Sequence, residues 1–192
     1  MSSPSDLEIE VKIPYADGAE AARRLIESRG LVVKAPRSFE ANTLFDRESR
    51  ELRHAGQLLR LRRVGNLSRV TYKGPALGGR YKSREEIEFD VSNPDRFAQV
   101  LERLGYSPGL RYEKFRTTFA VPGEPGEVTL DETPIGVFLE LEGDPEWIDR
   151  TAARLGFSAA EYVTRSYAVL YEQYRAKHPD APENMIFDSA GS

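Results

Sequence analysis

The sequence predicts an α+β fold in which about eight antiparallel strands close into a barrel, with helices packed on the outside. Two observations predict it: most candidate strands alternate aliphatic with fully charged residues, and the segments between them carry helical apolar stripes. Successive side chains of a strand point to opposite faces. A sheet with its aliphatic face against the helices and its charges inside satisfies both observations, and about eight strands can enclose one small ligand.

The first half of the chain yields its elements from local signals. Glycine commonly ends helices, and two residues such as Gly65-Asn66 between alternating segments indicate a hairpin. The expected elements are a strand at residues 7–15, a helix from Asp17 to Gly30, extended structure at 31–46 interrupted at Pro36, a polar connection at 47–56, the hairpin QLLRLRRV and LSRVTYKG, the loop GPALGG and a long strand RYKSREEIEFDV.

The second half follows the same logic. Proline at the first helical position favours a helix start, and Ser158 with Glu161 has the spacing of a capping box. The expected elements are a helix from Asn93-Pro94 to Gly105, strands YEKFRTTFAV, EVTLDET and VFLELEG, a helix from Asp144-Pro145 to Gly156, and a last helix from Ser158 to about Lys177. We therefore expect a disordered lead at residues 1–6, one domain at 7–177 and a flexible tail at 178–192.

The charged strand faces are the main functional signal. In DLEIEVKI, Glu8, Glu10 and Lys12 share one face, opposite four aliphatic residues. The same alternation groups further charges, namely Arg60 and Arg62; Arg69 and Lys73; Lys82, Arg84, Glu86, Glu88 and Asp90; Lys114 and Arg116; Asp131; and Glu140 and Glu142. A solvated outer face explains any one strand. Together, with arginines and glutamates grouped by strand, they predict a charged interior.

Charges of both signs inside a barrel require charged partners. Arginine binds phosphate through its bidentate fork, and lysine adds a compact charge. Paired carboxylates suit the hard cations Mg²⁺ and Mn²⁺. The alternation alone therefore predicts a polyphosphate bound together with metal.

Composition narrows the classes of function. The chain has 192 residues, 40% of them apolar, a net charge of −4 and no cysteine. Thiolate chemistry is excluded, a histidine-based site is disfavoured because only His54 and His178 exist, and an acidic chain is a poor general nucleic-acid binder. The N-terminal residues lack a signal-peptide pattern, and no apolar run reaches membrane-spanning length. We expect a soluble cytoplasmic protein, monomer or homodimer, without nucleic-acid or membrane partners.

Several motifs resemble one known family in order along the chain. Glu8-Ile9-Glu10-Val11-Lys12 resembles the ExExK signature of the CYTH domain, or triphosphate tunnel metalloenzymes. NTLFD, LRLRR, TYKGP, KSREEIE, YEKFR, LDETPIGVFLELEG and RSYAVLY resemble its later blocks, over roughly residues 7–175. The family includes class IV adenylate cyclases, thiamine triphosphatases and inorganic triphosphatases, and the resemblance is closest to prokaryotic members labelled as cyclases.

The resemblance implies a closed eight-stranded tunnel and a role for each matching position. Glu8 and Glu10 belong to the metal-binding and water-activating set. Glu140 and Glu142 form the core of the main metal site, with Glu10 and Glu88 as further ligands of Mg²⁺ or Mn²⁺ and Glu86 as an acidic tunnel residue. The triphosphate-binding cations are Lys12, Arg60, Arg62, Lys73, Lys82, Arg84, Lys114, Arg116 and Arg165. The role of Asp131 stays open.

The resulting hypothesis is a metal-dependent enzyme that acts on a triphosphate-containing small molecule. Hydrolysis is favoured over cyclisation because it requires only a tunnel, a metal and water. The alternatives are a class IV adenylate cyclase, which makes cyclic AMP and pyrophosphate from ATP, and a non-catalytic polyphosphate-binding module. Three glutamate pairs argue against the last, since simple anion binding does not need them.

Overall fold

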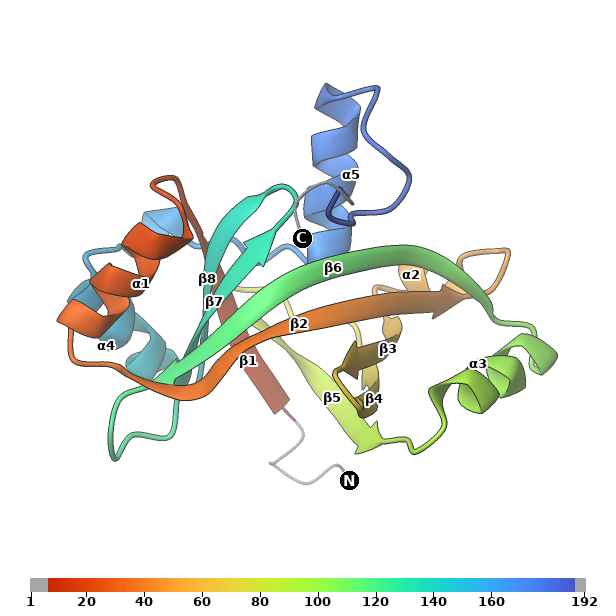
Figure 1. Cartoon of the computed structure of the whole chain (residues 1–192), viewed down its shortest axis with the longest axis horizontal. Coiled ribbons are helices and arrows are strands. Elements are labelled where there is room, and N and C mark those ends of the chain that lie inside the picture. The colour runs from red at the N-terminus through yellow and green to blue at the C-terminus, as the bar shows by residue number, and fades with distance from the viewer. Residues whose placement is uncertain (1–6, 189–192) are drawn as a thin grey trace.

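The computed structural model describes residues 7–188 and contains eight antiparallel strands and five α-helices in that range (Figure 1). The strands are β1 (Leu7–Tyr15), β2 (Val32–Asp46), β3 (Leu58–Val64), β4 (Leu67–Lys73), β5 (Lys82–Asp90), β6 (Ser107–Ala120), β7 (Glu127–Thr133) and β8 (Gly136–Glu142). The helices are α1 (Ala19–Ser28), α2 (Glu51–His54), α3 (Pro94–Arg103), α4 (Pro145–Leu155) and α5 (Tyr167–Lys177).

The strands close into one barrel in the order β1-β5-β4-β3-β2-β6-β7-β8. β1 closes it, because it pairs with β5 through Leu7–Glu10 and with β8 through Glu10–Tyr15. This confirms the closed eight-stranded antiparallel barrel. The long strands β2 and β6 pair along most of their length and cross the face seen in Figure 1.

Pro36 does not interrupt the second strand, contrary to the expectation. β2 runs through it, and the pairing with β6 shifts register between Ala35 and Ser38. Such an irregularity absorbs a residue that cannot donate a ladder hydrogen bond. The following connection, expected to be only polar loop, contains the short helix α2.

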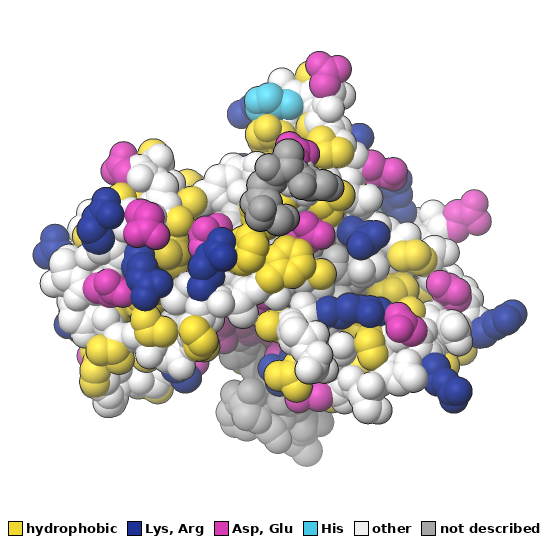
Figure 2. All heavy atoms as spheres, viewed as in Figure 1, with side chains coloured by type: hydrophobic (Ala, Val, Ile, Leu, Met, Phe, Trp, Pro, Cys, Tyr) yellow, Lys and Arg dark blue, Asp and Glu magenta, His cyan; other side chains and the backbone are white. Residues whose placement is uncertain are grey.

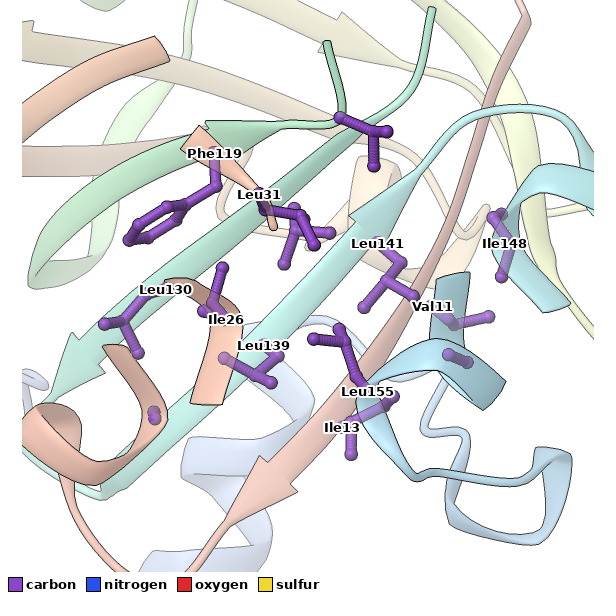
Figure 3. Close-up of a cluster of buried hydrophobic side chains, with 14 of the residues drawn as sticks. Val11, Ile13, Ile26, Leu31, Phe119, Leu130, Leu139, Leu141, Ile148 and Leu155 are labelled. Carbon is purple, nitrogen blue, oxygen red and sulfur yellow. The ribbon is translucent and has the colours of Figure 1, made fainter. Parts of the chain in front are cut away.

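The main hydrophobic core lies outside the barrel wall, as the alternation predicts. Figure 3 shows Val11 and Ile13 of β1 packing with Leu139 and Leu141 of β8, and with Ile148 from α4. The fully buried core also includes Ala22, Ile26, Phe119, Val128 and Ala152. Helices α1 and α4 therefore cover the outer face of β1, β7 and β8, while the inner face keeps its charges.

Two smaller hydrophobic clusters fix α3 and α5. Leu101 of α3 packs with Phe45, Leu61 and Val70 on the outer face of β2, β3 and β4. Tyr167 and Tyr171 of α5 pack with Tyr112, Phe138 and Met185. Helices α3 and α5 thus bury apolar side chains against the barrel.

The last helix begins later than the sequence predicts. Ser158 and Glu161 do form a capping box, but it opens only a 3₁₀ turn at Ala159–Glu161, and α5 starts after Ser166. The segment between them stays extended because Val163 pairs with Lys12 of β1 through two backbone hydrogen bonds, of 2.9 and 2.8 Å. Tertiary pairing overrides the local helix signal here.

The stretch after His178 also differs from the flexible tail that was expected. Met185 is fully buried, and its backbone exchanges hydrogen bonds with Arg111 and Glu113 of β6. Burial of the apolar Met185 side chain holds residues 184–187 against the barrel. The predicted lead at residues 1–6 and the tail residues 189–192 lie outside the described residues.

Candidate active site

The barrel encloses a cavity of about 170 Å³ with a highly charged wall. Its charged lining residues are Glu8, Glu10, Lys12, Arg60, Arg62, Lys73, Lys82, Arg84, Glu86, Glu88, Lys114, Arg116, Glu140 and Glu142. They come from β1, β3, β4, β5, β6 and β8, at alternate positions of each strand. Outside, Figure 2 shows acidic and basic side chains interspersed over the viewed face. Charges of both signs therefore converge inside the barrel.

Three predicted charges lie on the surface instead of in the cavity. Arg165 is exposed, and its Nη1 donates a hydrogen bond to Gln173 Oε1 at 2.9 Å, so the structure does not bring it into the cavity. Arg69 and Asp90 pair with each other at the exposed end of the β4–β5 ladder, at 2.7 Å. Lys82, in contrast, lines the cavity and is 6% exposed.

Glu10 and Glu140 share Lys12 as an ion-pair partner. Lys12 Nζ lies 3.1 Å from Glu10 Oε1 and 3.0 Å from Glu140 Oε1. Lys82 also pairs with Glu10, and Arg116 pairs with Glu140. Burial opposes ionisation of Glu10, but Lys12 and Lys82 outweigh it and hold the pKa of this carboxyl well below its usual range. Burial lowers the pKa of Lys82 to about 8, and nearby Lys12 adds to the effect.

A second group of charges surrounds Lys73 of β4. Its Nζ lies 2.5 Å from Glu8 Oε1 and 2.8 Å from Glu86 Oε2. Burial raises the pKa of Glu86 to about 8; Lys73 opposes this shift, and the carboxylate of Glu8 adds to it. Glu88 on the same strand accepts a hydrogen bond from the Thr71 hydroxyl at 2.6 Å. Each carboxylate in this part of the wall therefore has at least one cation within 4 Å.

Asp131 of β7, whose role the sequence left open, orients two cations. It is fully buried and does not line the cavity. Lys114 Nζ donates to its Oδ2 at 2.8 Å, and Arg116 donates through Nε to Oδ1 at 2.7 Å and through Nη2 to Oδ2 at 2.6 Å. The Tyr167 hydroxyl donates to Oδ2 at 2.7 Å. Asp131 thus holds Lys114 and Arg116 in place from behind the wall.

Glu142 lies at the end of β8 on the rim of the cavity, and it differs from the other tunnel carboxylates because no cation among residues 7–188 lies within 4 Å of it. Desolvation by the surrounding protein and the charges of Glu8 and Glu10 raise its pKa to about 7. Glu142 is the direct register partner of Glu10 across β1 and β8. Glu142 has no cation partner in the described part of the chain and lies near the carboxylates of Glu8 and Glu10. Together these groups offer the hard oxygen donors that Mg²⁺ or Mn²⁺ prefers.

The carboxylates are not gathered around one point. Within the described part of the chain, no three acidic or histidine side chains are arranged to hold a metal ion. Lys12, Lys82 and Arg116 instead occupy oxygens of Glu10 and Glu140. The carboxylate oxygens fit a divalent ion. When that ion binds, Lys12, Lys82 and Arg116 would have to exchange Glu10 and Glu140 for another anion.

Several residues of this region lie outside the charged set that was predicted from the sequence. Glu40 and Asn42 of β2 are buried beside Arg62, whose Nε donates to Asn42 Oδ1 at 3.2 Å. Extending the alternation rule to FEANTLFD would have found them, since both share one strand face. Leu44, Leu58, Tyr112 and Tyr167 also line the cavity. Tyr167 could not be found this way because it comes from a helix.

Comparisons with known proteins agree with this architecture. The family model described as the CYTH domain matches residues 6–167. The chain belongs to the CYTH domain family. A protein of Methanocaldococcus jannaschii, named provisionally as an adenylate cyclase, is 28% identical over 137 residues, covering 71% of this chain and 76% of that protein.

Two solved CYTH-like structures share the fold. A Pyrococcus horikoshii protein has 26% identity and a TM-score of 0.73, covering 88% of this chain and 99% of its own. A Vibrio parahaemolyticus protein, also named provisionally as an adenylate cyclase, has 22% identity and a TM-score of 0.74, covering 87% and 98%. As for membranes, none of the helices described in this CYTH chain is both long and apolar enough to span one.

Proposed function

We propose that this CYTH protein is a metal-dependent phosphohydrolase that acts on triphosphate-containing small molecules. The observation that carries the proposal is the cavity wall, which presents cations from β1, β3, β4, β5 and β6 together with carboxylates from β1, β5 and β8. A linear triphosphate carries several negative charges along its length and matches such a distributed set of cations.

The cations hold the phosphates and stabilise charge as a P–O bond breaks. Arg60 and Arg62 present planar guanidinium forks, suited to bidentate contact with phosphate oxygens. Lys114 and Arg116 are held by Asp131, so that only the contact of Arg116 with Glu140 has to change when substrate arrives. Cations that are already oriented stabilise a phosphoryl-transfer transition state effectively.

Glu10, Glu140 and Glu142 would hold the divalent ion, with Glu88 as a further candidate ligand. Bound there, Mg²⁺ or Mn²⁺ would supply positive charge to the phosphate oxygens and orient the nucleophile. In our proposal Lys12, Lys82 and Arg116 move from these carboxylates to the triphosphate as the site fills. Glu8 and Glu10 are the candidates for orienting the attacking water and accepting its proton.

The second candidate is a class IV adenylate cyclase. The provisional names of the Methanocaldococcus and Vibrio relatives favour it. In that reaction the ribose 3′-hydroxyl of ATP would attack instead of water, and pyrophosphate would leave. Hydrolysis is preferred because every residue that it requires can be named in the cavity, whereas no set of described residues forms a defined adenine-binding site.

Product analysis tests the proposal. Purified protein with Mg²⁺ or Mn²⁺ is incubated with ATP, thiamine triphosphate or inorganic triphosphate, and phosphate, pyrophosphate and cyclic AMP are measured. We expect phosphate and a diphosphate product. Cyclic AMP and pyrophosphate from ATP would favour the cyclase. Binding of triphosphates without turnover under all metal conditions would favour a polyphosphate-binding module, and full turnover in excess chelator would exclude metal dependence.

A further inference from the structure

The barrel has a seam beside Glu10, where the pairing between β1 and β5 ends. Pairing of β1 with β5 stops at Glu10 and Lys82, whereas pairing of β1 with β8 continues to Tyr15. Beyond this point, the edge of β1 is covered at Lys12 by Val163, through the two backbone hydrogen bonds described above. The wall beside Glu10, Lys12 and Lys82 is therefore completed by two connecting segments, residues 74–81 and 157–166.

A single carboxylate on α4 joins these two segments. Asp149 accepts hydrogen bonds from Arg80 Nη2 at 3.0 Å, from the Tyr81 hydroxyl at 2.9 Å and from the Tyr162 hydroxyl at 3.0 Å. The tyrosine rings lie 6.4 Å apart, and the guanidinium of Arg80 lies over both, at 5.5 and 5.8 Å. We call Arg80, Tyr81, Asp149 and Tyr162 the Asp149 cluster.

Helix α4 is a fixed support for this cluster. Its Trp147, Ile148, Ala152 and Leu155 are almost completely buried in the outer core, and Figure 3 shows Ile148 and Leu155 near β1 and β8. Asp149 leaves that core and is 35% exposed at its side chain. Because the helix cannot shift without disturbing the core, Asp149 defines where both segments lie.

The two tyrosines are each one residue from a position in the tunnel wall. Tyr81 precedes Lys82, whose ammonium pairs with Glu10 inside the cavity. Tyr162 precedes Val163, which holds the backbone of Lys12. The loop before Tyr81 contains Gly78 and Gly79, which give its backbone conformational freedom unless the end of the loop is held. Asp149 therefore contacts the residue that precedes Lys82 and the residue that precedes Val163, the backbone partner of Lys12. Lys12 and Lys82 are the two cations that pair with Glu10.

We propose that Asp149 is a positioning residue that holds the seam closed and so sets Lys12 and Lys82 against Glu10. It does not line the cavity, and it acts through Tyr81 and Tyr162. This role rests on the proposed function, because it concerns the same triphosphate-binding wall. Without Asp149, residues 74–81 and Val163 separate, and the two ammonium groups lose their defined positions.

Two variants and one matched control test the proposal. Asp149→Ala removes the shared acceptor, and the double variant Tyr81→Phe with Tyr162→Phe keeps both rings but removes the hydroxyl donors. Arg150→Ala is the control, because it breaks the exposed ion pair with Glu124 from the next position of α4. Binding of inorganic triphosphate is measured by titration calorimetry, and amide exchange is followed at Lys12 and Val163.

We expect Asp149→Ala and the double tyrosine variant to weaken triphosphate binding at least fivefold and to speed exchange at both amides. Arg150→Ala should change neither. Asp149→Asn keeps an acceptor oxygen and should lose less affinity than Asp149→Ala. If Asp149→Ala does not fold, the double variant decides the question.

A purely structural tie gives a different result. It would lower the unfolding midpoint while the folded variants bind inorganic triphosphate as the wild type does, and that outcome overturns the proposal. Failure of the proposed function is distinguishable, because it shows in the wild-type protein itself, which then does not release phosphate from triphosphates.

Discussion

The hydroxyl of Tyr167 donates a hydrogen bond to Asp131 Oδ2 at 2.7 Å and so connects the start of α5 to the cationic wall of the barrel. The ring of Tyr167 also faces Lys12 and Lys114, whose ammonium groups lie 5.3 and 5.1 Å from its centroid. Asp131, Tyr167 and these cations therefore form one buried network. Its central member is Asp131, because its carboxylate accepts hydrogen bonds from Tyr167, Lys114 and Arg116.

Asp131→Asn should destabilise the protein strongly. The substitution keeps the shape but removes the charge that pairs with Lys114 and Arg116. Breaking a buried ion pair by removing one partner costs about 3–5 kcal/mol. The free energy of unfolding in urea measures the loss. Glu132→Gln is the matched control, because the neighbouring Glu132 pairs with Arg37 at the surface, where an ion pair contributes about 0–1 kcal/mol. Equal effects of the two substitutions would contradict the role given to Asp131.

Arg62→Ala should weaken triphosphate binding, whereas Arg63→Ala should not. Arg62 lines the cavity, and its neighbour Arg63 points outward to Asp95 at 2.6 Å. A hydrogen bond to a charged group contributes about 1.5–3 kcal/mol, which corresponds to roughly a ten- to hundredfold loss of affinity. Calorimetric titration with inorganic triphosphate gives both values. A loss of similar size in Arg63→Ala would show that the effect is general rather than specific to the inner face.

Metal binding should strengthen as the pH rises through about 7. The pKa of Glu142 is raised to about 7 by desolvation and by Glu8 and Glu10, so this carboxyl holds a proton below that pH and becomes a charged ligand above it. Because a metal ligand must be deprotonated, apparent affinity for Mn²⁺ should rise up to about tenfold per pH unit below 7 and level off above it. Titrations with Mn²⁺ from about pH 5.5 to about pH 8.5, a range that brackets this pKa, follow the change.

Glu142→Gln should bind Mn²⁺ weakly and lose the pH dependence near 7. The control is Glu127→Gln, which alters the register partner of Glu142 on the neighbouring strand but leaves the tunnel carboxylates intact. A wild-type affinity that does not change across this pH range would remove Glu142 from the metal site.

The same shift has a defined sign for stability in the absence of metal. The folded-state pKa of Glu142 lies above the ordinary value of 4.5, so the native state binds more protons than the unfolded state between these two values. The free energy of unfolding contributed by this group therefore falls as the pH rises from about 4.5 to about 7. Metal-free Glu142→Gln should lack this component in urea denaturation curves at pH 5 and pH 7, roughly the ends of that window.

The strand alternation was sufficient to predict the barrel and most of its charged lining. An aliphatic face against helices and a charged face inside follow from the period of two, and Glu8, Glu10 and Lys12 could be assigned from eight residues of sequence. Asp131 shows the limit of the rule. Its face was correct, but only the structure shows that it lies behind Lys114 and Arg116 instead of in the cavity.

Contacts between distant segments could not be predicted in this way. Val163 pairs with Lys12 across about 150 residues of chain, and this pairing prevents the helix that Ser158 and Glu161 indicate locally. The place of Arg165 depends on where α5 begins, so its assignment to the cavity could not be checked from the sequence. Met185 returns to β6 because of packing partners that no local pattern reveals.

The last prediction concerns what part of the substrate is recognised. The lining of the cavity is mostly charged, and among the described residues the uncharged lining is limited to Leu44, Leu58, Tyr112, Ser166, Tyr167 and Ala168. Most of the binding free energy should therefore come from the triphosphate. Inorganic triphosphate, ATP and GTP should compete with affinities within about tenfold of one another, because a charge-assisted contact has the same value whatever the organic group, and the monophosphates should bind much more weakly. Competition calorimetry with each compound measures this ranking, and Arg62→Ala should weaken all three triphosphates alike.

Tight binding of ATP alone, with that preference intact in Arg62→Ala, would indicate a specific base-binding site and favour the cyclase over the hydrolase. Leu58→Asn would then locate the site, since it should weaken ATP and leave inorganic triphosphate unchanged if the base lies against the uncharged residues.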